Sequence, residues 1–395
     1  MANTLKVIDM VTREALRIAH EKATFIGTID RQYDSSFANT GAKIGETLRI
    51  RKPVQYNVRS GRVMDVQDST ETTTTLSVTN QKGVDIRFNS AELSLDVDVF
   101  SERFIKPAMT RLISEIEADV LQGCIKATPQ VVGTPGTVPS DLSAWGDARS
   151  RINKQLAPKD DNRYIQADSA TMSSMVNGLK GLFQDSGQIK SQYREGMMGR
   201  TSGFDWYENE RCWTMPNSAD VAGAINNGTL TSGITSLTVD GLTAAPVEGM
   251  VFTIADVYDV HPETKDAYSH LKQFVCASGC TTTNLDFTPA VIYSTTDATQ
   301  NCSGTPVNDA AITFVGSAST SYLQNLAYHK EAFTFATADL PLYDDAEKCA
   351  RREQDGISLR CWQGTDIRND EMLMRLDILY GYKAIRPEWA CRVTN

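Results

Sequence analysis

One stretch constrains the fold of this chain more than any other, the helical pattern from Asp98 to Lys126. Its apolar side repeats every four residues, at Phe100, Phe104, Ala108, Leu112, Ile116 and Val120. That spacing places one side of a helix against a core. A helix of this length would run roughly 40 Å, which is long for a globular protein. Each step of four turns the apolar stripe by about 40°, so we expect different elements to cover the helix early and late.

Two prolines and one carboxylate set the expected limits of this helix. Asp98 can accept a hydrogen bond from a free N–H of the first turn, and Pro129 cannot continue a helix. Pro107 lies inside the pattern. It predicts either a kink or a long helix that starts close to it.

Charge is distributed unevenly along the 395 residues, which carry a net charge of −10. Residues 217–325 hold ten acids against two lysines, so they carry −8 and the rest carries −2. Residues 43–63 are basic, with six Lys or Arg against Glu46 alone. An acidic insertion and a basic arm on a near-neutral body predict electrostatic contacts between copies of the chain or with an acidic partner.

Composition favours a soluble chain folded in a cytoplasm. Hydrophobic content is 41%, and no apolar run is long enough to cross a membrane. The first twenty residues are typical of an amphipathic helix, which we expect over 4–22, and lack the apolar core of a signal peptide. The eight cysteines are scattered, so we interpret them as reduced and mostly buried thiols.

The sequence period changes to two after Gly45, which predicts strands. Alternation covers Thr47–Arg51, Val63–Val66, Thr72–Val78 and Val84–Phe88, and Ser60–Arg62 is a turn signal. We predict a long two-stranded arm over 43–90, polar on both faces at its tip. Because an isolated hairpin is barely stable in water, this segment is either a flexible surface loop or an arm whose missing contacts come from another chain.

The second half of the chain predicts an α/β layer and an inserted β domain. Helices are expected at 141–155 and 169–182, with Asp168 as a cap and a buried strand at 163–167 between them. Residues 217–325 are rich in Thr, Ser, Gly and Asp, with short β runs and frequent turns that favour a small barrel or sandwich. Asp345–Glu353 is expected to be a charged loop, and Leu373–Ile385 a strand broken at Gly381.

A search for catalytic and metal-binding patterns is mostly negative. Cys276 and Cys280, with His261 and His270 nearby, lack the second short pair of ligands that a structural zinc site needs. No phosphate-binding loop is present. We interpret the lone His329 as a packed or surface residue. We interpret the acids of the long helix, Glu115, Glu117 and Asp119, as solvated helix faces.

Nucleic-acid binding and subunit contact compete as uses of the basic residues. Arg351, Arg352 and the basic arm have the charge that a nucleic-acid site needs, but only Tyr56 interleaves with the arm charges as an aromatic base-stacking residue. Contact between subunits is therefore the favoured use. The remaining classes are an enzyme with an inserted lid domain and a phage tail or adhesin protein, which the Thr/Ser-rich insert favours.

The order of predicted elements resembles the major capsid protein of tailed phages, with the Hong Kong 97-type coat fold. The resemblance is nearest to the coat proteins of short-tailed Salmonella phages, which carry an inserted β-barrel. It is carried by GAKIGETLRIRKP (Gly41–Pro53), FSERFIKPAM (Phe100–Met109), SGFDWYEN (Ser202–Asn209) and RLDILYGYKAIRPE (Arg375–Glu388). It implies an α+β fold with an N-terminal helix, a hairpin arm, a long spine helix, an α/β axial domain and the β insert.

The resemblance also implies a division of the chain and an assembly. The expected parts are an N-terminal arm (1–42), the extended loop (43–90), a peripheral domain (91–126 and 326–363), an axial domain (127–216 and 364–395) and the insert (217–325). Copies would form hexamers and pentamers of an icosahedral head around double-stranded DNA. The expected contacts between subunits are Arg51, Lys52, Arg59, Arg62, Glu102 and Arg103.

The resemblance further implies no catalysis, cofactor or metal, and a set of assembly partners. These are a scaffolding protein that meets Met1–Glu21, a portal protein, a decoration protein and non-specifically packaged DNA, with no membrane contact. Assembly would take place in the host cytoplasm and the product would be the virion. Some relatives crosslink their shells through a lysine. Because Gln55–Asp68 contains none, we expect non-covalent association.

Overall fold

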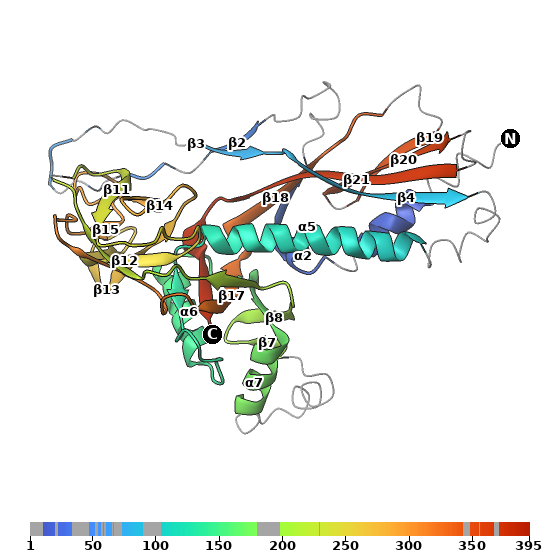
Figure 1. Cartoon of the computed structure of the whole chain (residues 1–395). Coiled ribbons are helices and arrows are strands. Elements are labelled where there is room, and N and C mark those ends of the chain that lie inside the picture. The colour runs from blue at the N-terminus through green and yellow to red at the C-terminus, as the bar shows by residue number, and fades with distance from the viewer. Residues whose placement is uncertain are drawn as a thin grey trace. The chain divides into compact units, whose positions relative to one another are not determined.

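A computed structural model shows how these elements are arranged (Figure 1). It describes residues 11–19, 23–33, 47–51, 54–56, 58, 61–64, 66, 73–89, 104–179, 198–228, 230–342, 348–354, 356–366 and 371–395. The chain forms two compact units. Unit 1 comprises Met1–Ile50, Thr73–Val120 and Phe333–Lys383, and unit 2 comprises Arg51–Thr72, Leu121–Ala332 and Ala384–Asn395.

Unit 1 is built on a six-stranded sheet. Its strand order is β1-β18-β21-β20-β19, and β4 also pairs with β21. The strands are β1 (Asp30–Tyr33), β4 (Asn80–Asn89), β18 (Phe333–Ala338), β19 (Lys348–Gln354), β20 (Ile357–Asp366) and β21 (Glu371–Ala384). β4 runs antiparallel to β21 over its whole length (Figure 1). Residues 84–88 therefore belong to this sheet, and the prediction that placed them in the two-stranded arm is wrong.

Three helical segments contribute to unit 1. Residues 11–19 are helical and bury Ala15, Leu16 and Ile18, in agreement with the expected first helix, whose other residues lie outside the described part. A short helix, α2, covers Phe25–Thr28, and the long helix α5 covers Lys106–Ala127 and continues into unit 2. Because α5 begins one residue before Pro107, the proline occupies the first turn, where its missing N–H is not needed. Asp98 lies outside the described residues.

The base of the predicted arm is a two-stranded sheet. It pairs β2 (Thr47–Arg51) with β3 (Thr73–Ser77). Leu76 and Val78 are buried in a cluster with Leu379, and Ile50 packs against the same cluster. Beyond this base, the described arm residues 54–56, 58, 61–64 and 66 form no strand.

Unit 2 contains the predicted β insert as a closed barrel. Its strands are β10 (Ala222–Ile225), β11 (Ile234–Asp240), β12 (Val251–Val260), β13 (Ala267–Cys276), β14 (Asn284–Val291) and β16 (Ala311–Phe314). The order β13-β14-β11-β10-β16-β12 is closed by pairing of β12 with β13, and β15 (Cys302–Ser303) pairs with β12. Phe252, Phe274, Phe287 and Phe314 fill the interior, with ring centroids 5.3 to 5.7 Å apart.

The rest of unit 2 is the predicted α/β layer. Its sheet has the order β5-β22-β17-β6-β8-β7, and β9 also pairs with β17. The strands are β5 (Val131–Val132), β6 (Arg163–Ala167), β7 (Arg200–Thr201), β8 (Phe204–Glu208), β9 (Trp213–Pro216), β17 (Ser321–His329) and β22 (Ala390–Thr394). Its helices are α6 (Ser143–Lys154), α7 (Ser169–Leu179) and two short 3₁₀ turns, η3 (Lys330–Ala332) and η4 (Pro387–Trp389). Asp168 caps α7, since its Oδ1 accepts a hydrogen bond from the Thr171 N–H at 3.3 Å.

Two sequence predictions for unit 1 are wrong, the charged loop at 345–353 and the strand break at Gly381. The segment expected as a charged loop at 345–353 is largely strand β19, paired with β20 from Lys348 onward. β21 continues through Gly381 without a break. Glycine is needed there because a Cβ would overlap the carbonyl oxygen of Ser77. In the described part of the chain, no helix is long and apolar enough to span a membrane.

Candidate functional site

The six predicted contact residues are only partly described. Arg51, at the end of β2, and Arg62, beside the turn at Gly61, both have exposed side chains. Lys52, Arg59, Glu102 and Arg103 lie outside the described residues. Their grouping as one contact surface therefore stays a prediction.

The arm carries exposed apolar side chains that sequence reasoning missed. Tyr56, Val58, Val63, Met64 and Val66, called the arm tip below, are 63 to 97% exposed. The arm was expected to be polar on both faces here, and the short apolar run around Val63 was the signal that pointed the other way. Water-exposed apolar groups gathered on one segment are typical of a contact surface.

Glu117 corrects the interpretation of the acids on α5 as solvated. Its side chain is fully buried in unit 1. It accepts hydrogen bonds from the Phe25 backbone N–H and, at 2.8 Å, from the Thr24 hydroxyl. Both donors lie at the start of α2, so Glu117 satisfies free N–H groups of that short helix. The carboxylate ties the N-terminal segment to α5.

Asp119 also accepts a hydrogen bond within unit 1, whereas Glu115 is solvated as predicted. Asp119 Oδ2 accepts a hydrogen bond from the Tyr380 hydroxyl at 2.5 Å. Burial, together with this bond, raises the pKa of Tyr380 well above its usual range. Glu115 is half-exposed and lies 3.5 Å from Lys82 Nζ and 3.7 Å from Arg111. Such exposed pairs contribute about 0–1 kcal/mol each.

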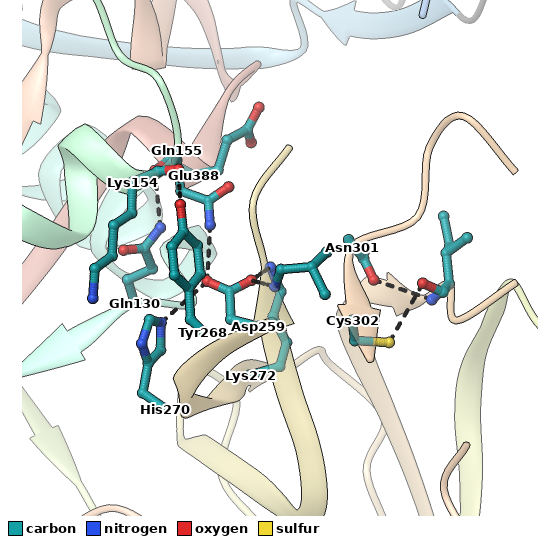
Figure 2. Close-up of polar contacts among 12 residues, drawn as sticks. Gln130, Lys154, Gln155, Asp259, Tyr268, His270, Lys272, Asn301, Cys302 and Glu388 are labelled. Carbon is teal, nitrogen blue, oxygen red and sulfur yellow. Dashed lines mark hydrogen bonds and ion pairs between the residues drawn. The ribbon is translucent and has the colours of Figure 1, made fainter. Parts of the chain in front are cut away.

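In unit 2, a buried carboxylate joins the barrel to the α/β layer (Figure 2). Asp259 of β12 is 5% exposed. Lys272 Nζ lies 2.7 Å from its Oδ1, and His270 Nε2 lies 3.3 Å from its Oδ2. Gln155, which follows α6, donates to the same Oδ2 at 2.9 Å. One carboxylate thus binds two barrel residues and the end of a helix outside the barrel.

Aromatic and backbone contacts extend this junction (Figure 2). The Tyr268 hydroxyl donates to the Lys154 carbonyl at 3.0 Å, and Lys154 Nζ lies 5.0 Å from the centre of the Tyr268 ring. The Tyr268 and His270 rings stack at 5.3 Å. Trp389 Nε1 donates to the Gln155 carbonyl at 3.0 Å. The end of α6 is therefore held from the barrel and from the C-terminal segment.

The surroundings of Asp259 favour its charged form. Burial raises the pKa of this carboxyl, but the hydrogen bond from His270 and the charge and hydrogen bond of Lys272 outweigh that effect. The net pKa of Asp259 lies below its ordinary value. A carboxyl whose pKa is lower in the folded than in the unfolded chain stabilises the fold above the unfolded pKa, about 3.9. This stabilisation is lost as the pH falls through the folded pKa.

We expect Asp259→Asn to lower the free energy of unfolding by about 2–4 kcal/mol at pH 7, because it leaves Lys272 buried without its counter-charge. The difference from wild type should begin to shrink below about pH 4, where the carboxyl of the unfolded chain takes up a proton, and it should go on shrinking as the pH falls through the lower pKa of the folded chain. Urea unfolding of the full chain at pH 7 and pH 3 measures both values. Asp309→Asn, at an exposed site on the same barrel, should change little. A difference that stays constant across this pH range would contradict the role given to the Asp259 charge.

A buried arginine forms a second junction in unit 2. Arg392 of β22 is fully buried. Its guanidinium donates to the Gly249 carbonyl at 2.7 Å and to the Lys126 carbonyl at 3.1 Å. Among the described residues, no carboxylate pairs with it. Lys126 lies in the last turn of α5, where carbonyls lack helical partners and the helix dipole is negative. The arginine thus joins the C-terminal strand, the end of α5 and the barrel.

The surroundings of Gly249 make this junction sterically specific. Gly249 has a φ of 93°, and a Cβ there would lie 2.9 Å from the Trp213 ring and 3.1 Å from Lys126 Cγ. Glycine is therefore required on both backbone and steric grounds. Lys126 Nζ lies 5.4 Å from the centre of the Trp213 ring and 3.5 Å from Glu248.

The residues considered for catalysis and metal binding have structural contacts. His329 is buried, packs on Trp389 and lies 3.0 Å from Asp160, so of the two predicted alternatives, a packed or a surface histidine, the structure shows the packed one. Within the described ranges, no group of three or more His, Cys, Asp or Glu side chains could hold a metal ion. The polar groups of unit 2 instead fasten its parts together.

Comparison with known proteins identifies the family. The fold is a mixed α+β scaffold with an inserted closed barrel and an exposed apolar arm tip. The sequence model of the family described as "P22 coat protein - gene protein 5" matches residues 1–392. The chain belongs to the P22 coat protein family and is a major capsid protein of a phage head, a component of the virion. No curated protein matches the sequence.

Solved phage structures are similar to this chain at low sequence identity. A chain of Mycobacterium phage Che8 is 12% identical, with 94% of this chain and 90% of that chain covered and a TM-score of 0.48. The capsid of cyanophage P-SCSP1u is 10% identical, with coverages of 93% and 85% and a TM-score of 0.47. The mature capsid of bacteriophage PhiM1 is 10% identical, with coverages of 94% and 86% and a TM-score of 0.44.

Proposed function

We propose that this coat protein assembles with copies of itself into hexamers and pentamers, which close into an icosahedral head around double-stranded DNA. The observation that carries the proposal is the match to a coat protein family over nearly the whole chain. The exposed arm tip supports it, because burying these side chains against a neighbouring copy would remove apolar surface from water. Many copies of one modest contact stabilise a closed shell.

The proposal includes a division of labour along the chain. The arm would lie on a neighbouring subunit, and the axial domain would surround the centre of each ring. The acidic insert would face outward, since negative charge is repelled by packaged DNA. The predicted parts are 1–42, 43–90, 91–126 with 326–363, 127–216 with 364–395, and 217–325. Because β4 and β21 belong to the sheet of unit 1, the proposal moves Asn80–Asn89 and 371–383 to the peripheral part.

Assembly partners complete the proposal. Residues 1–21 would meet a scaffolding protein before maturation, and a portal protein and a decoration protein would join the shell. Assembly would take place in the host cytoplasm, and the DNA would be held without sequence preference. The proposal assigns the chain no catalytic activity and no cofactor.

The basic arm is proposed to contact an acidic neighbour. The proposed contact residues are Arg51, Lys52, Arg59, Arg62, Glu102 and Arg103. Contacts between exposed charges weaken as salt is added, because the Debye length falls from about 10 Å at 0.1 M to about 3 Å at 1 M.

Negative-stain microscopy of the full chain, expressed with a scaffolding protein, tests the function. Closed particles or rings are expected. Arg59→Glu combined with Arg62→Glu should reduce their yield, and added salt should reduce the wild-type yield in the same way. A chain that stays strictly monomeric at high concentration would contradict shell formation. A particle yield that does not respond to salt or to these substitutions would contradict the proposed charge contact, but it would not contradict the fold.

A further inference from the structure

Two asparagines of this chain are followed directly by glycine, and the fold places them in different surroundings. Asn177–Gly178 lies inside helix α7, whereas Asn227–Gly228 lies in the connection between β10 and β11 of the barrel. An asparagine before a glycine can react with its own backbone, because glycine has no side chain to hinder attack by its amide nitrogen on the asparagine side chain. The structure therefore decides which of the two asparagines is open to this reaction.

The backbone at Gly228 leaves its amide nitrogen available. Gly228 is exposed, and within the described ranges its N–H has no hydrogen-bond partner. A Cβ added at Gly228 would meet nothing within 4 Å, and the φ of this residue lies outside the left-handed region that favours glycine. Neither the backbone conformation nor close packing therefore requires a glycine here. The nitrogen is accessible to solvent and can lose its proton without breaking a hydrogen bond.

The fold also holds the oxygen of the Asn227 side chain. Asn227 Oδ1 accepts a hydrogen bond from the backbone N–H of Thr238 on β11. When a nucleophile attacks Asn227 Cγ, negative charge develops on this oxygen, and a fixed N–H donor aimed at it stabilises that charge. The attacking nitrogen and the attacked carbon belong to adjacent residues and close a small ring, so the chain itself brings them together. The hydrogen bond from Thr238 therefore favours the reaction.

Asn177 is protected on the same criteria. Gly178 belongs to α7, in which a backbone N–H donates to the carbonyl one turn earlier. A Cβ at Gly178 would lie 1.7 Å from the carbonyl oxygen of Ser140, so the helix packs directly on that segment at this point. Ring closure at Asn177 would therefore require α7 to open locally, which costs free energy.

We propose that Asn227 is a self-modification site of the barrel, which converts without an enzyme to aspartate or isoaspartate through a cyclic imide formed with Gly228. The Gly228 nitrogen loses its proton to solvent and attacks Asn227 Cγ. The new N–C bond forms, the Cγ–Nδ2 bond breaks, and the side-chain nitrogen takes a proton from solvent and leaves as ammonia. Water then adds to one of the two imide carbonyls and breaks its bond to the nitrogen. The net reaction consumes one water, releases one ammonia and involves no oxidation or reduction.

The two products affect the barrel differently. Aspartate keeps an oxygen for the Thr238 N–H and adds a negative charge to the acidic insert. Isoaspartate carries the main chain through the former side chain, so the backbone becomes longer and the oxygen that bound Thr238 changes place. β10 and β11 share a short pairing, which the hydrogen bond from the Asn226 N–H to the Thr238 carbonyl at 2.9 Å extends. Isoaspartate therefore weakens one of the strand pairings that close the barrel. The inference depends on the barrel alone and is independent of the proposed assembly.

The test compares the two Asn–Gly sites within one sample of the full-length chain. The native protein is kept in mildly alkaline buffer made with heavy-oxygen water, and its peptides are analysed over time by mass spectrometry. We expect Asn227 to take up one heavy oxygen at least roughly tenfold faster than Asn177, which reacts only when α7 opens. In urea the two rates should become similar. Equal rates in the native chain, or a difference of the same size in urea, would overturn the proposal.

A variant and the product mixture test the cyclic route. Gly228→Ala should slow the conversion of Asn227 by roughly tenfold or more, because a side chain hinders approach of the nitrogen. Its urea midpoint should equal that of wild type, since the added Cβ meets nothing. Gly146→Ala, at an exposed glycine of α6 with equally open surroundings, should leave the conversion unchanged. Electron-transfer fragmentation should identify isoaspartate at Asn227. Aspartate as the sole product, or an unchanged rate in Gly228→Ala, would indicate direct hydrolysis and contradict the proposal.

Discussion

Arg392→Met should lower the free energy of unfolding of the full chain by about 2–5 kcal/mol. Methionine keeps most of the apolar stem but donates no hydrogen bond, so the carbonyls of Gly249 and Lys126 lose their partner. A buried polar group without a partner costs about 1–3 kcal/mol. Urea unfolding, followed by tryptophan fluorescence, measures the loss.

An opposing effect makes this experiment informative. Burial of a charge is costly, and replacing buried charges with apolar residues sometimes stabilises a protein. We expect the hydrogen bonds to the two carbonyls to outweigh the cost of burying the charge, because one carbonyl lies at the negative end of α5, where a cation is favoured. The free energy of unfolding of Arg392→Lys should lie between the values for Arg392→Met and wild type, since a single ammonium reaches fewer acceptors. Arg149→Met, at an exposed site of the same unit, is the matched control.

A methionine variant as stable as wild type, or more stable, would show that the cost of burying the guanidinium exceeds the value of its bonds. The junction would then depend on the steric fit around Gly249 and Trp213. In that event, Gly249→Ala should become the most damaging single change at the junction.

Loss of assembly without loss of folding is expected when the arm tip is made polar. Val58→Ser, Val63→Ser and Val66→Ser together remove three exposed apolar side chains. Burying a valine contributes about 1.5 kcal/mol or more, so the three together represent about 4 kcal/mol per arm contact. Because about 1.4 kcal/mol is a tenfold change, each contact should weaken by roughly 1,000-fold.

Particle yield after co-expression, measured by sedimentation and microscopy, reports the effect. The urea midpoint of the unassembled chain should stay close to wild type, since the three side chains make no core contacts. Val307→Ser provides the control, because Val307 is 59% exposed on the barrel and lies outside the arm. Normal particles from the triple variant would exclude the arm tip as an assembly contact.

Local signals in the sequence were sufficient for much of the fold. The spacing of apolar residues predicted α5, and Asp168 predicted the start of α7 because a cap acts within three residues. The frequent turns of 217–325 predicted a small barrel or sandwich, and the structure shows a barrel. Each of these signals depends on neighbours in the sequence, which a single chain displays directly.

Elements buried on both faces escaped prediction. β17 and β22 are almost entirely buried, so neither shows the polar-apolar alternation that marks a half-buried strand. β22 even carries Arg392, a charged residue in the interior. β19 escaped for the opposite reason, because its charges resemble those of a loop although they lie on an edge strand.

The junctions depend on partners that are distant in the sequence. The sequence predicts a solvated acid at Glu117, because its hydrogen-bond donors, Thr24 and Phe25, lie far earlier in the chain. No local sequence pattern marks Asp259 as a junction residue, since its partner Gln155 lies in another part of unit 2. Spacing within one helix or strand carries no information about such contacts.

Closure of the barrel affects how readily unassembled subunits aggregate. In a concentrated protein, unpaired strand edges recruit other chains into aggregates. In the barrel, β12 pairs on both sides and completes the ring, so this ring offers no such edge. β19 ends its sheet, but Lys348, Arg351 and Arg352 place like charges along it, which discourages adventitious stacking of identical strands. Precipitation of immature subunits should therefore begin elsewhere than in the insert.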